Sequence, residues 1–227
     1  MQDTELLILH EDNHLIVVNK KPSQIVQGDK TGDAPLPDLI KEFLKVKYDK
    51  PGNVFCGVVH RLDRPVSGVC VFAKTSKALT RLNLQFQVKT TRKIYWAIVE
   101  KAPKEKSGTL QHHLQKNEKQ NKSYVVSAGV KDAKHAILHY KTLKTSDNYT
   151  LLEVELETGR HHQIRCQLAT IGCIIKGDLK YGAKRSNPDA SICLHARSLE
   201  IDHPTQDEKL KFIAPVPEGS LWSFFAK

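Results

Sequence analysis

The 227-residue chain contains no long apolar segment. Its apolar runs, such as those at residues 6–9 and 15–18, have the length of strands and are far too short to span a membrane. The N-terminus is acidic rather than basic, so it does not resemble a secretory signal. Internal repeats and low-complexity segments are also missing. These absences favour a globular protein of the cytoplasm that contacts no membrane.

Cysteine is scarce, and it is not arranged in pairs. The five cysteines form no CxxC motif, and most lie in apolar surroundings, which favours buried reduced thiols over disulfides or a zinc site. The adjacent histidines at 112–113 and 161–162 lack the i,i+4 spacing that places two metal ligands on one face of a helix. We therefore expect no metal.

Acidic residues are outnumbered by basic ones, and the imbalance is local. The chain has 35 Lys and Arg against 25 Asp and Glu, a formal charge of +10. Residues 74–144 hold 16 basic and 4 acidic residues (16 − 4 = +12), so the remainder carries −2. An excess of this kind predicts a polyanionic partner. The alternative is a solvated lysine-rich surface that binds nothing.

The hydrophobic pattern predicts an α+β fold. Segments rich in Val and Ile, or with alternating polarity, predict strands at 14–20, 68–74, 94–99, 136–143, 149–157, 191–199 and 210–213. Helices are expected after Pro35, after the Thr75 cap, and over 163–171 before Gly172. The polar stretch 116–122 reads as an exposed hairpin tip. We expect a single domain over residues 1–227, with a mixed, mostly antiparallel sheet core flanked by helices.

The segment 60–68, with the sequence HRLDRPVSG, places one carboxylate between two arginines just before an apolar strand. Nearby cations favour the ionised form of Asp63. A loop at the end of a rigid strand is also a common place for reactive groups. The alternative is a structural turn carboxylate that is paired to Arg61 or Arg64.

Two further segments carry polar residues in apolar surroundings. In 91–99 (TRKIYWAIV), Tyr95 lies in an apolar strand beside two cations. In 158–165 (TGRHHQIR), a strand meets a helix that carries Arg165 about one turn inside, and KGDLKYG follows at 176–182. The alternative reading of Tyr95 is a core tyrosine with a hydrogen-bonded hydroxyl.

In this order and spacing, the motifs HRLDxxxSG, KxYxA, GRxHQIR and GDxxYG resemble those of the RluA-type RNA pseudouridine synthases. The resemblance covers nearly the whole chain. It implies a single pseudouridine synthase-like catalytic domain, without the accessory N-terminal RNA-binding domain that many relatives carry. The chain departs from the usual pattern at Val66, His161 and Gln167, where relatives often have Thr, Thr and His.

The resemblance implies that the protein isomerises specific uridines to pseudouridine in structured ribosomal or transfer RNA, without a cofactor. Asp63 would start the reaction at the sugar, as a nucleophile or as a base. Arg165 would be its ion-pair partner, and Tyr95 would stack on the uracil. Because a stacked uridine cannot reach Asp63, the nucleotide must be flipped out, and Arg61 matches the position from which relatives insert a side chain.

The resemblance also adds residues that would contact RNA or substrate, namely His60, Leu62, Lys74, Arg160 and Ile164. For Lys74 the alternative is a solvated lysine at a strand end. We expect RNA as the partner and a monomeric protein. The rival function is an RNA-binding or RNA-folding module of the same fold without chemistry, although binding alone would not need Asp63, Tyr95 and Arg165. A glycosidase would require a second carboxylate, which these motifs do not supply.

Overall fold

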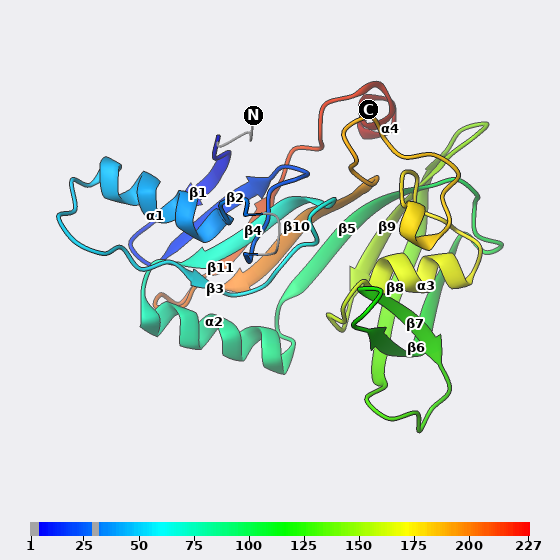
Figure 1. Ribbon diagram of the computed structural model, residues 1–227, viewed down its shortest axis with the longest axis horizontal. Helices are drawn as coiled ribbons and strands as arrows, with labels where there is room; N and C mark the ends of the chain where they lie inside the picture. Colours follow the sequence, from blue (N-terminus) through cyan, green and yellow to red (C-terminus); the bar gives the residue numbers. More distant parts are fainter. Residues whose placement is uncertain (1–4, 29–31) are drawn as a thin grey trace. The chain divides into compact units, whose positions relative to one another are not determined.

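The computed structural model describes residues 5–28 and 32–227 (Figure 1). The chain packs as two compact units, the first comprising residues 1–91 and 196–217 and the second residues 92–195 and 218–227. The acidic N-terminal residues Met1–Thr4 lie outside the described residues. None of the described helices is long and apolar enough to cross a bilayer.

The first unit is built on a sheet with the strand order β1-β2-β4-β10, in which β3 also pairs with β4 and β11 with β10. The strands are β1 (Ile8–Glu11), β2 (Leu15–Lys20), β3 (Gly57–Val58), β4 (Ser67–Ala73), β10 (Leu194–Asp202) and β11 (Lys209–Ile213). Strand β4 is buried along its whole length, which explains its continuous apolar run. In the antiparallel register with β2, Lys20 lies opposite Gly68, so the end of β2 is beside the start of β4.

Two helices belong to the first unit. Helix α1 (Leu36–Lys47) begins after Pro35, has Pro37 and an acidic residue in its first turn, and buries Leu36, Ile40 and Leu44. Helix α2 (Ser76–Val88) is capped by Thr75, whose hydroxyl accepts the Ala78 N–H, as expected from the sequence. The buried residues of α2 join the core that β2, β4, β10 and β11 share.

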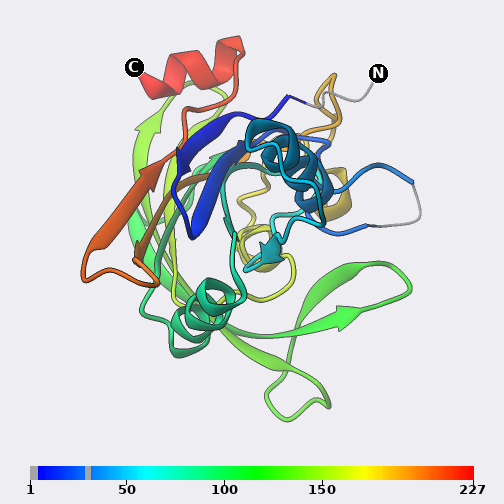
Figure 2. The same cartoon turned by 90° about the vertical axis from the view of Figure 1, so that its left-hand side faces the viewer.

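The second unit is an antiparallel sheet in the order β5-β9-β8-β6-β7. Its strands are β5 (Arg92–Val99), β6 (Ser107–Asn117), β7 (Lys122–Val126), β8 (Lys134–Thr145) and β9 (Thr150–Leu156). Strand β9 alternates as predicted, with Leu152, Val154 and Leu156 buried and the glutamates between them more exposed. The polar stretch forms the turn between β6 and β7, and Figure 2 shows this turn and the one after β7 in green. The predicted mixed, mostly antiparallel sheet with flanking helices is confirmed, whereas one domain over residues 1–227 stays a prediction.

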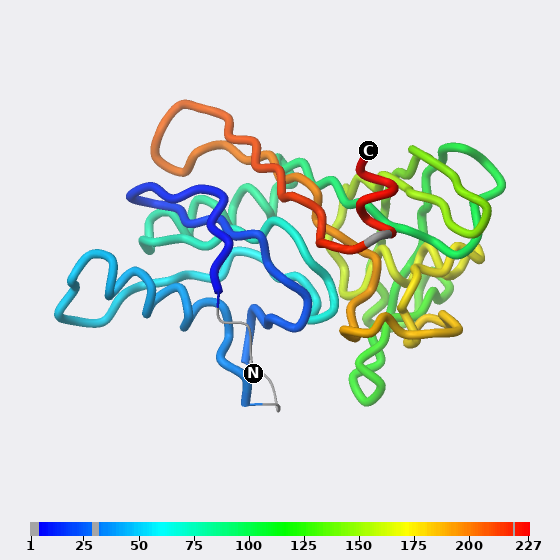
Figure 3. The backbone as a smooth tube through the Cα atoms, turned by 90° about the horizontal axis from the view of Figure 1, so that it is seen from above, coloured from blue at the N-terminus to red at the C-terminus, as the bar shows by residue number. Residues whose placement is uncertain are grey.

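Helix α3 (Gln163–Thr170) and the short 3-10 helix η1 (Leu179–Tyr181) complete the second unit together with α4 (Ser220–Ala226). Figure 3 shows β10 and β11 in orange, joined by the turn between them. The sequence did not predict α4, because seven residues are too few for a helical period to be recognised. Its Trp222 and Phe225 are buried, so tertiary packing stabilises this terminal helix.

Candidate active site

The loop that carries Asp63 lies between β3 and β4 in the first unit. The Val66 N–H donates to the Asp63 carbonyl oxygen at 3.0 Å and closes a turn around the aspartate. Leu62 and Val66 are buried, whereas Asp63 between them is partly exposed. The two apolar side chains therefore anchor the loop on both sides of the partly exposed aspartate. Val66, where relatives often have Thr, fills an apolar site.

Lys20, the last residue of β2, stabilises the Asp63 loop. The Lys20 side chain is fully buried, and its Nζ donates to the carbonyl oxygens of Lys21, Arg64 and Val66 at 3.0, 3.1 and 2.6 Å. Burial lowers the pKa of Lys20 to about 7, while the charge of Asp63 acts in the opposite direction. Three acceptors match the three N–H groups of an ammonium, so Lys20 fixes the backbone around the candidate catalytic carboxylate.

Gly68 ends the motif because no side chain fits there. Its φ is +117°, and a Cβ at this position would lie 2.3 Å from the carbonyl oxygen of Ala196 on β10. Glycine is the residue that permits both this backbone conformation and this close approach. The motif therefore ends where β4 enters the buried sheet, which sets the position of the loop before it.

The two arginines that flank Asp63 both contact side chains from the segment before α1. Arg61 is exposed, and its guanidinium donates to the side-chain oxygen of Gln27. Arg64 forms an ion pair with Asp33 at 2.6 Å. An exposed arginine that is held by a neutral amide exchanges partners at low cost, since only one neutral acceptor is lost.

His60 contacts residues of α2 and β4. Its ring stacks on Phe86 of α2, with centroids 5.0 Å apart and planes at 17°. Its Nε2 accepts the Val71 N–H at 3.1 Å, so in the neutral ring the proton is on Nδ1. These contacts tie the start of the Asp63 loop to α2 and β4.

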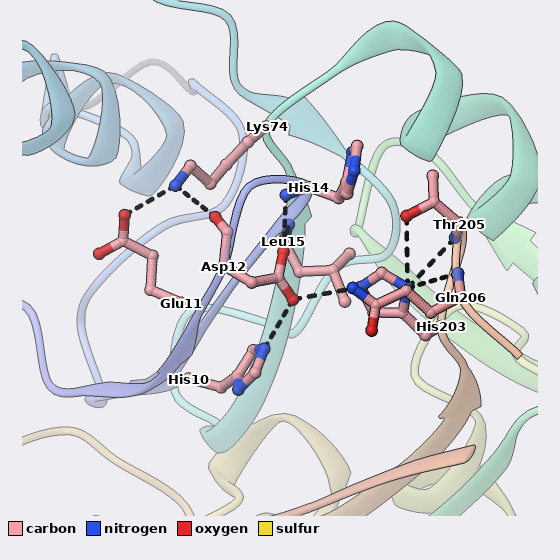
Figure 4. Close-up of polar contacts among 9 residues, drawn as sticks. All are labelled: His10, Glu11, Asp12, His14, Leu15, Lys74, His203, Thr205 and Gln206. Carbon is pink, nitrogen blue, oxygen red and sulfur yellow. Dashed lines mark hydrogen bonds and ion pairs between the residues drawn. The ribbon is translucent and has the colours of Figure 1, made fainter. Parts of the chain in front are cut away.

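The structure contradicts one of the two interpretations of Lys74, that of a solvated lysine at a strand end. Its side chain is 9% exposed, and Nζ pairs with Glu11 at 2.7 Å and also donates to the Asp12 carbonyl oxygen (Figure 4). Burial alone would raise the pKa of Glu11, but bonds from Lys47, Lys74 and Tyr48 lower it to about 2. Lys74 therefore fastens the turn between β1 and β2.

The same turn contains a second polar contact set, visible in Figure 4. Asp12 accepts the backbone N–H groups of His14 and Leu15 through Oδ1, and its Oδ2 faces His203 at 3.3 Å. The Nδ1 of His203 accepts the Gln206 N–H at 2.9 Å, so its proton is on Nε2 and points to Asp12. These bonds join the β1–β2 turn to the β10–β11 turn, so the role they give Asp12 is structural.

Tyr95 lies on β5 in the second unit, opposite Val154 of β9, which in turn is opposite Tyr140 of β8. Opposite residues of adjacent strands share a face of the sheet. Val154 and Tyr140 are buried, whereas Tyr95 is partly exposed. Tyr95 is thus the partly exposed member of this row of side chains, which suits a ring that stacks on a base.

Arg165 on α3 has a buried carboxylate partner that the sequence reading did not include. Its Nε and Nη2 donate to Oδ2 and Oδ1 of Asp178 at 2.7 and 2.8 Å. The side chains of Arg165 and Asp178 are 5% and 1% exposed. The Nη1 of Arg165 makes a further bond of 3.0 Å to Nε2 of His162. A bidentate pair of this kind fixes the plane of the guanidinium as well as its position.

His162 is locked in one protonation state. Because a guanidinium only donates, Nε2 of His162 must accept, and its Nδ1–H then donates to the Tyr181 hydroxyl at 3.1 Å. The hydroxyl also accepts the Ser123 N–H at 2.9 Å and donates to the Ser123 carbonyl at 3.1 Å. Burial, reinforced by the charge of Arg165, lowers the pKa of His162 to about 2. The ring is therefore neutral.

The other predicted contact residues of the second unit flank this network. Arg160 donates through Nε to the His135 carbonyl at 2.9 Å, and Ile164 is buried on α3. Gln167, where relatives often have His, is fully buried and donates to the Leu110 carbonyl at 3.1 Å. His161 contacts the Ser123 hydroxyl and thereby the β6–β7 hairpin.

The nine predicted site residues divide between the units. The first holds His60, Arg61, Leu62, Asp63 and Lys74, and the second holds Tyr95, Arg160, Ile164 and Arg165. The sequence did not predict the supporting hydrogen bonds of Lys20, Asp178 and Tyr181. A lysine at the end of the apolar run LIVVNK and the GDxxYG motif were the available signals. Among the described residues, no group of three or more His, Cys, Asp or Glu side chains is placed to hold a metal ion.

Comparison with known proteins gives consistent matches. A family model described as RNA pseudouridylate synthase matches residues 14–170. Ribosomal large subunit pseudouridine synthase D of Pseudomonas aeruginosa is 36% identical over 238 residues, which cover 97% of this chain and 71% of that protein. The protein of the same name from Zymomonas mobilis is 33% identical over 232 residues, with 96% and 71% covered. The solved structure of Human RNA Pseudouridylate Synthase Domain Containing 4 has the same fold, with a TM-score of 0.78 at 24% identity over 97% of this chain and 90% of that chain.

Proposed function

This chain belongs to the RluA-type RNA pseudouridine synthases, a family of isomerases, and we propose that it converts specific uridines of structured RNA to pseudouridine with Asp63 as the residue that starts the reaction. The observation that carries the proposal is the partly exposed carboxylate of Asp63 on a loop that buried Lys20 fixes at two backbone carbonyls. A group that is rigidly held but accessible is what a reaction at a bound sugar requires.

The reaction moves one bond. The glycosidic bond from ribose to N1 of uracil breaks, the base rotates while it remains bound, and C5 forms the new bond to the ribose as its proton leaves. We propose that Asp63 acts at the sugar, as a nucleophile or as a base, and that Arg165 is the cation that pairs with it. Tyr95 would stack on the rotating uracil and assist removal of the C5 proton. None of these steps calls for a cofactor.

The substrate that we propose is ribosomal RNA, with transfer RNA as the other possibility. Two relatives with over 30% identity are named for the large ribosomal subunit, which favours the first. Either substrate would place the enzyme in the cytoplasm. Arg61 is exposed two residues before Asp63, which supports the proposal that it enters the stack that a flipped uridine leaves.

The proposal is tested by mapping pseudouridines in ribosomal and transfer RNA from cells with and without the gene, followed by reaction of the purified protein with the RNA that changed. We expect specific sites to lose pseudouridine in the deletion strain and to regain it with the wild-type gene but not with Asp63→Asn. Binding of that RNA without any pseudouridine formation would instead support the RNA-binding or RNA-folding module.

A further inference from the structure

We propose that Asp178 is a positioning residue for the isomerisation, which sets the orientation of the Arg165 guanidinium through two parallel hydrogen bonds. The inference rests on the proposed function, in which Arg165 is the cation that pairs with Asp63. It assigns to the GDxxYG motif a task that neither the family match nor the fold specifies.

The geometry restricts Arg165 strongly. Its bonds to Asp178 use the Nε edge of the guanidinium, at 2.7 and 2.8 Å, and therefore fix both the plane and the rotation of the group. The bond from Nη1 to His162 adds a third point. These bonds occupy three of the five N–H groups that a guanidinium carries, all within the second unit. The three bonds thereby fix the direction in which the whole guanidinium faces.

Three elements supply this support. Asp178 lies directly before η1, His162 directly before α3, and Tyr181 within η1. Tyr181 connects His162 to the backbone of Ser123 on β7, so the acceptor that faces Arg165 is itself held by strand β7. The orientation of the Arg165 guanidinium is therefore set before a substrate binds, so little of its orientational freedom remains to be lost during the reaction.

A buried pair of opposite charges also occurs for purely structural reasons, so stability alone does not test the inference. A structural role predicts that the variants which still fold retain the wild-type rate. A positioning role predicts a slower chemical step in a folded protein that binds RNA normally. The slower chemical step must also depend on the presence of Arg165.

The first experiment compares Asp178→Asn with a matched Asp147→Asn control, which changes an exposed residue of the same unit. Single-turnover rates at saturating RNA, the RNA dissociation constant and the thermal unfolding midpoint are measured. We expect the rate of Asp178→Asn to fall about tenfold to hundredfold, in line with small misplacements of reacting groups. The dissociation constant should stay within about twofold, and the control should match the wild type. A folded Asp178→Asn with the wild-type rate would overturn the inference.

The second experiment repeats Asp178→Asn in an Arg165→Ala background. If Asp178 acts through Arg165, the double variant should be no slower than Arg165→Ala alone, because residues that work as a unit are non-additive. Losses that multiply would overturn the inference. Should Asp178→Asn fail to fold, Tyr181→Phe removes a single oxygen and loosens His162 instead. We then expect a smaller rate loss that also disappears in the Arg165→Ala background, and a multiplying loss would again count against the inference.

A third measurement does not need activity. The Nε–H of Arg165 should give a slowly exchanging signal in nitrogen-15 NMR of the wild type, identified by its loss in Arg165→Lys. The signal should exchange rapidly in Asp178→Asn or, should that variant not fold, more rapidly in Tyr181→Phe than in the wild type. An unprotected signal in the wild type would overturn the inference even if pseudouridine forms. A protected signal in a protein that forms no pseudouridine would refute the proposed function instead.

Discussion

The Nζ of Lys20 lies 2.6 Å from the carbonyl oxygen of Val66, three residues after Asp63. A buried cation thus reaches the backbone of the loop that carries the candidate catalytic carboxylate. The relationship makes the end of β2 part of the site, although Lys20 is fully buried and cannot contact RNA.

We expect Lys20→Met to lower the free energy of unfolding by about 1–3 kcal/mol, because buried carbonyl oxygens lose their donor. The Val66 N–H, which closes the turn around Asp63, should exchange with solvent faster. Denaturant unfolding and hydrogen exchange measure the two effects. The matched control is Lys21→Met, which removes the ion pair with the exposed Glu5 and should cost less than about 1 kcal/mol. Equal effects of the two variants would argue against the support role of Lys20.

We expect Asp63→Asn to abolish isomerisation while the RNA affinity stays within about tenfold, since phosphate contacts dominate affinity. The substitution keeps the size of the side chain on a loop that Leu62 and Val66 anchor, so the fold should persist. Pseudouridine formation and a binding titration are measured on the same preparation. Turnover by the purified variant would refute the proposed role of Asp63.

We expect Arg61→Ala to lose far more activity on structured RNA than on a short single strand. An inserted side chain offsets the unstacking of the flipped nucleotide, which costs a few kcal/mol in a duplex and least in an open strand. Arg64→Ala is the comparison variant, because Arg64 already pairs with Asp33. The rates of the two variants are measured on both substrates. Equal losses of Arg61→Ala on structured RNA and on the single strand would mean that Arg61 serves the chemistry or the fold.

Stability should fall as the pH drops from about 6.5 to 4.5. The unfolded chain protonates His162 near pH 6.5, whereas burial lowers its pKa in the folded protein to about 2. The unfolded state therefore binds more protons, which at pH 5 amounts to about 2 kcal/mol lost from this residue. Glu11 and Asp12, with pKa values of about 2, lose their contribution only at lower pH.

The variant that tests this pH dependence is His162→Asn, because asparagine does not titrate and tolerates the φ of 50° at this position. Denaturant unfolding of this variant between pH 7 and 4.5 should show a flatter profile than the wild type. The exposed His135→Asn is the matched control for the replacement of a histidine. A wild-type slope in His162→Asn would mean that other groups cause the loss.

The salt dependence of RNA binding should separate the lysines of the β6–β7 turn. Lys116 and Lys119 are exposed, whereas Lys122 is half-buried with its Nζ 4.9 Å from the Tyr181 ring centre. We expect Gln at each of the first two to flatten the slope of log affinity against log salt by roughly one unit per lost phosphate contact. Lys122→Gln should change stability more than the slope. Unchanged slopes for Lys116→Gln and Lys119→Gln would move the RNA path away from this turn.

The sequence indicated those parts of the site that lie on periodic elements or in contiguous motifs. The apolar run of β4 was sufficient to place the Asp63 loop before a buried strand, and the alternation of β9 predicted which of its side chains are buried. The pairing of Arg165 with Asp178 could not be predicted in the same way. Asp178 follows thirteen residues later, in an irregular segment whose path depends on tertiary packing. Lys20 was missed for a related reason, since a lysine that ends a strand usually reaches solvent.

The two turns on either side of β7 offer different prospects for protein engineering. The turn before β7 is fastened by Lys180, whose Nζ donates to the Asn121 carbonyl at 3.0 Å. The turn after β7 has open space around Gly129, where an added Cβ would meet nothing within 4 Å. An affinity tag inserted after Gly129, which keeps the glycine that a φ of +90° favours, would extend into solvent, whereas the same insertion at Asn121 would pull on the strand that holds Tyr181. Reporters of RNA binding therefore belong in the second turn.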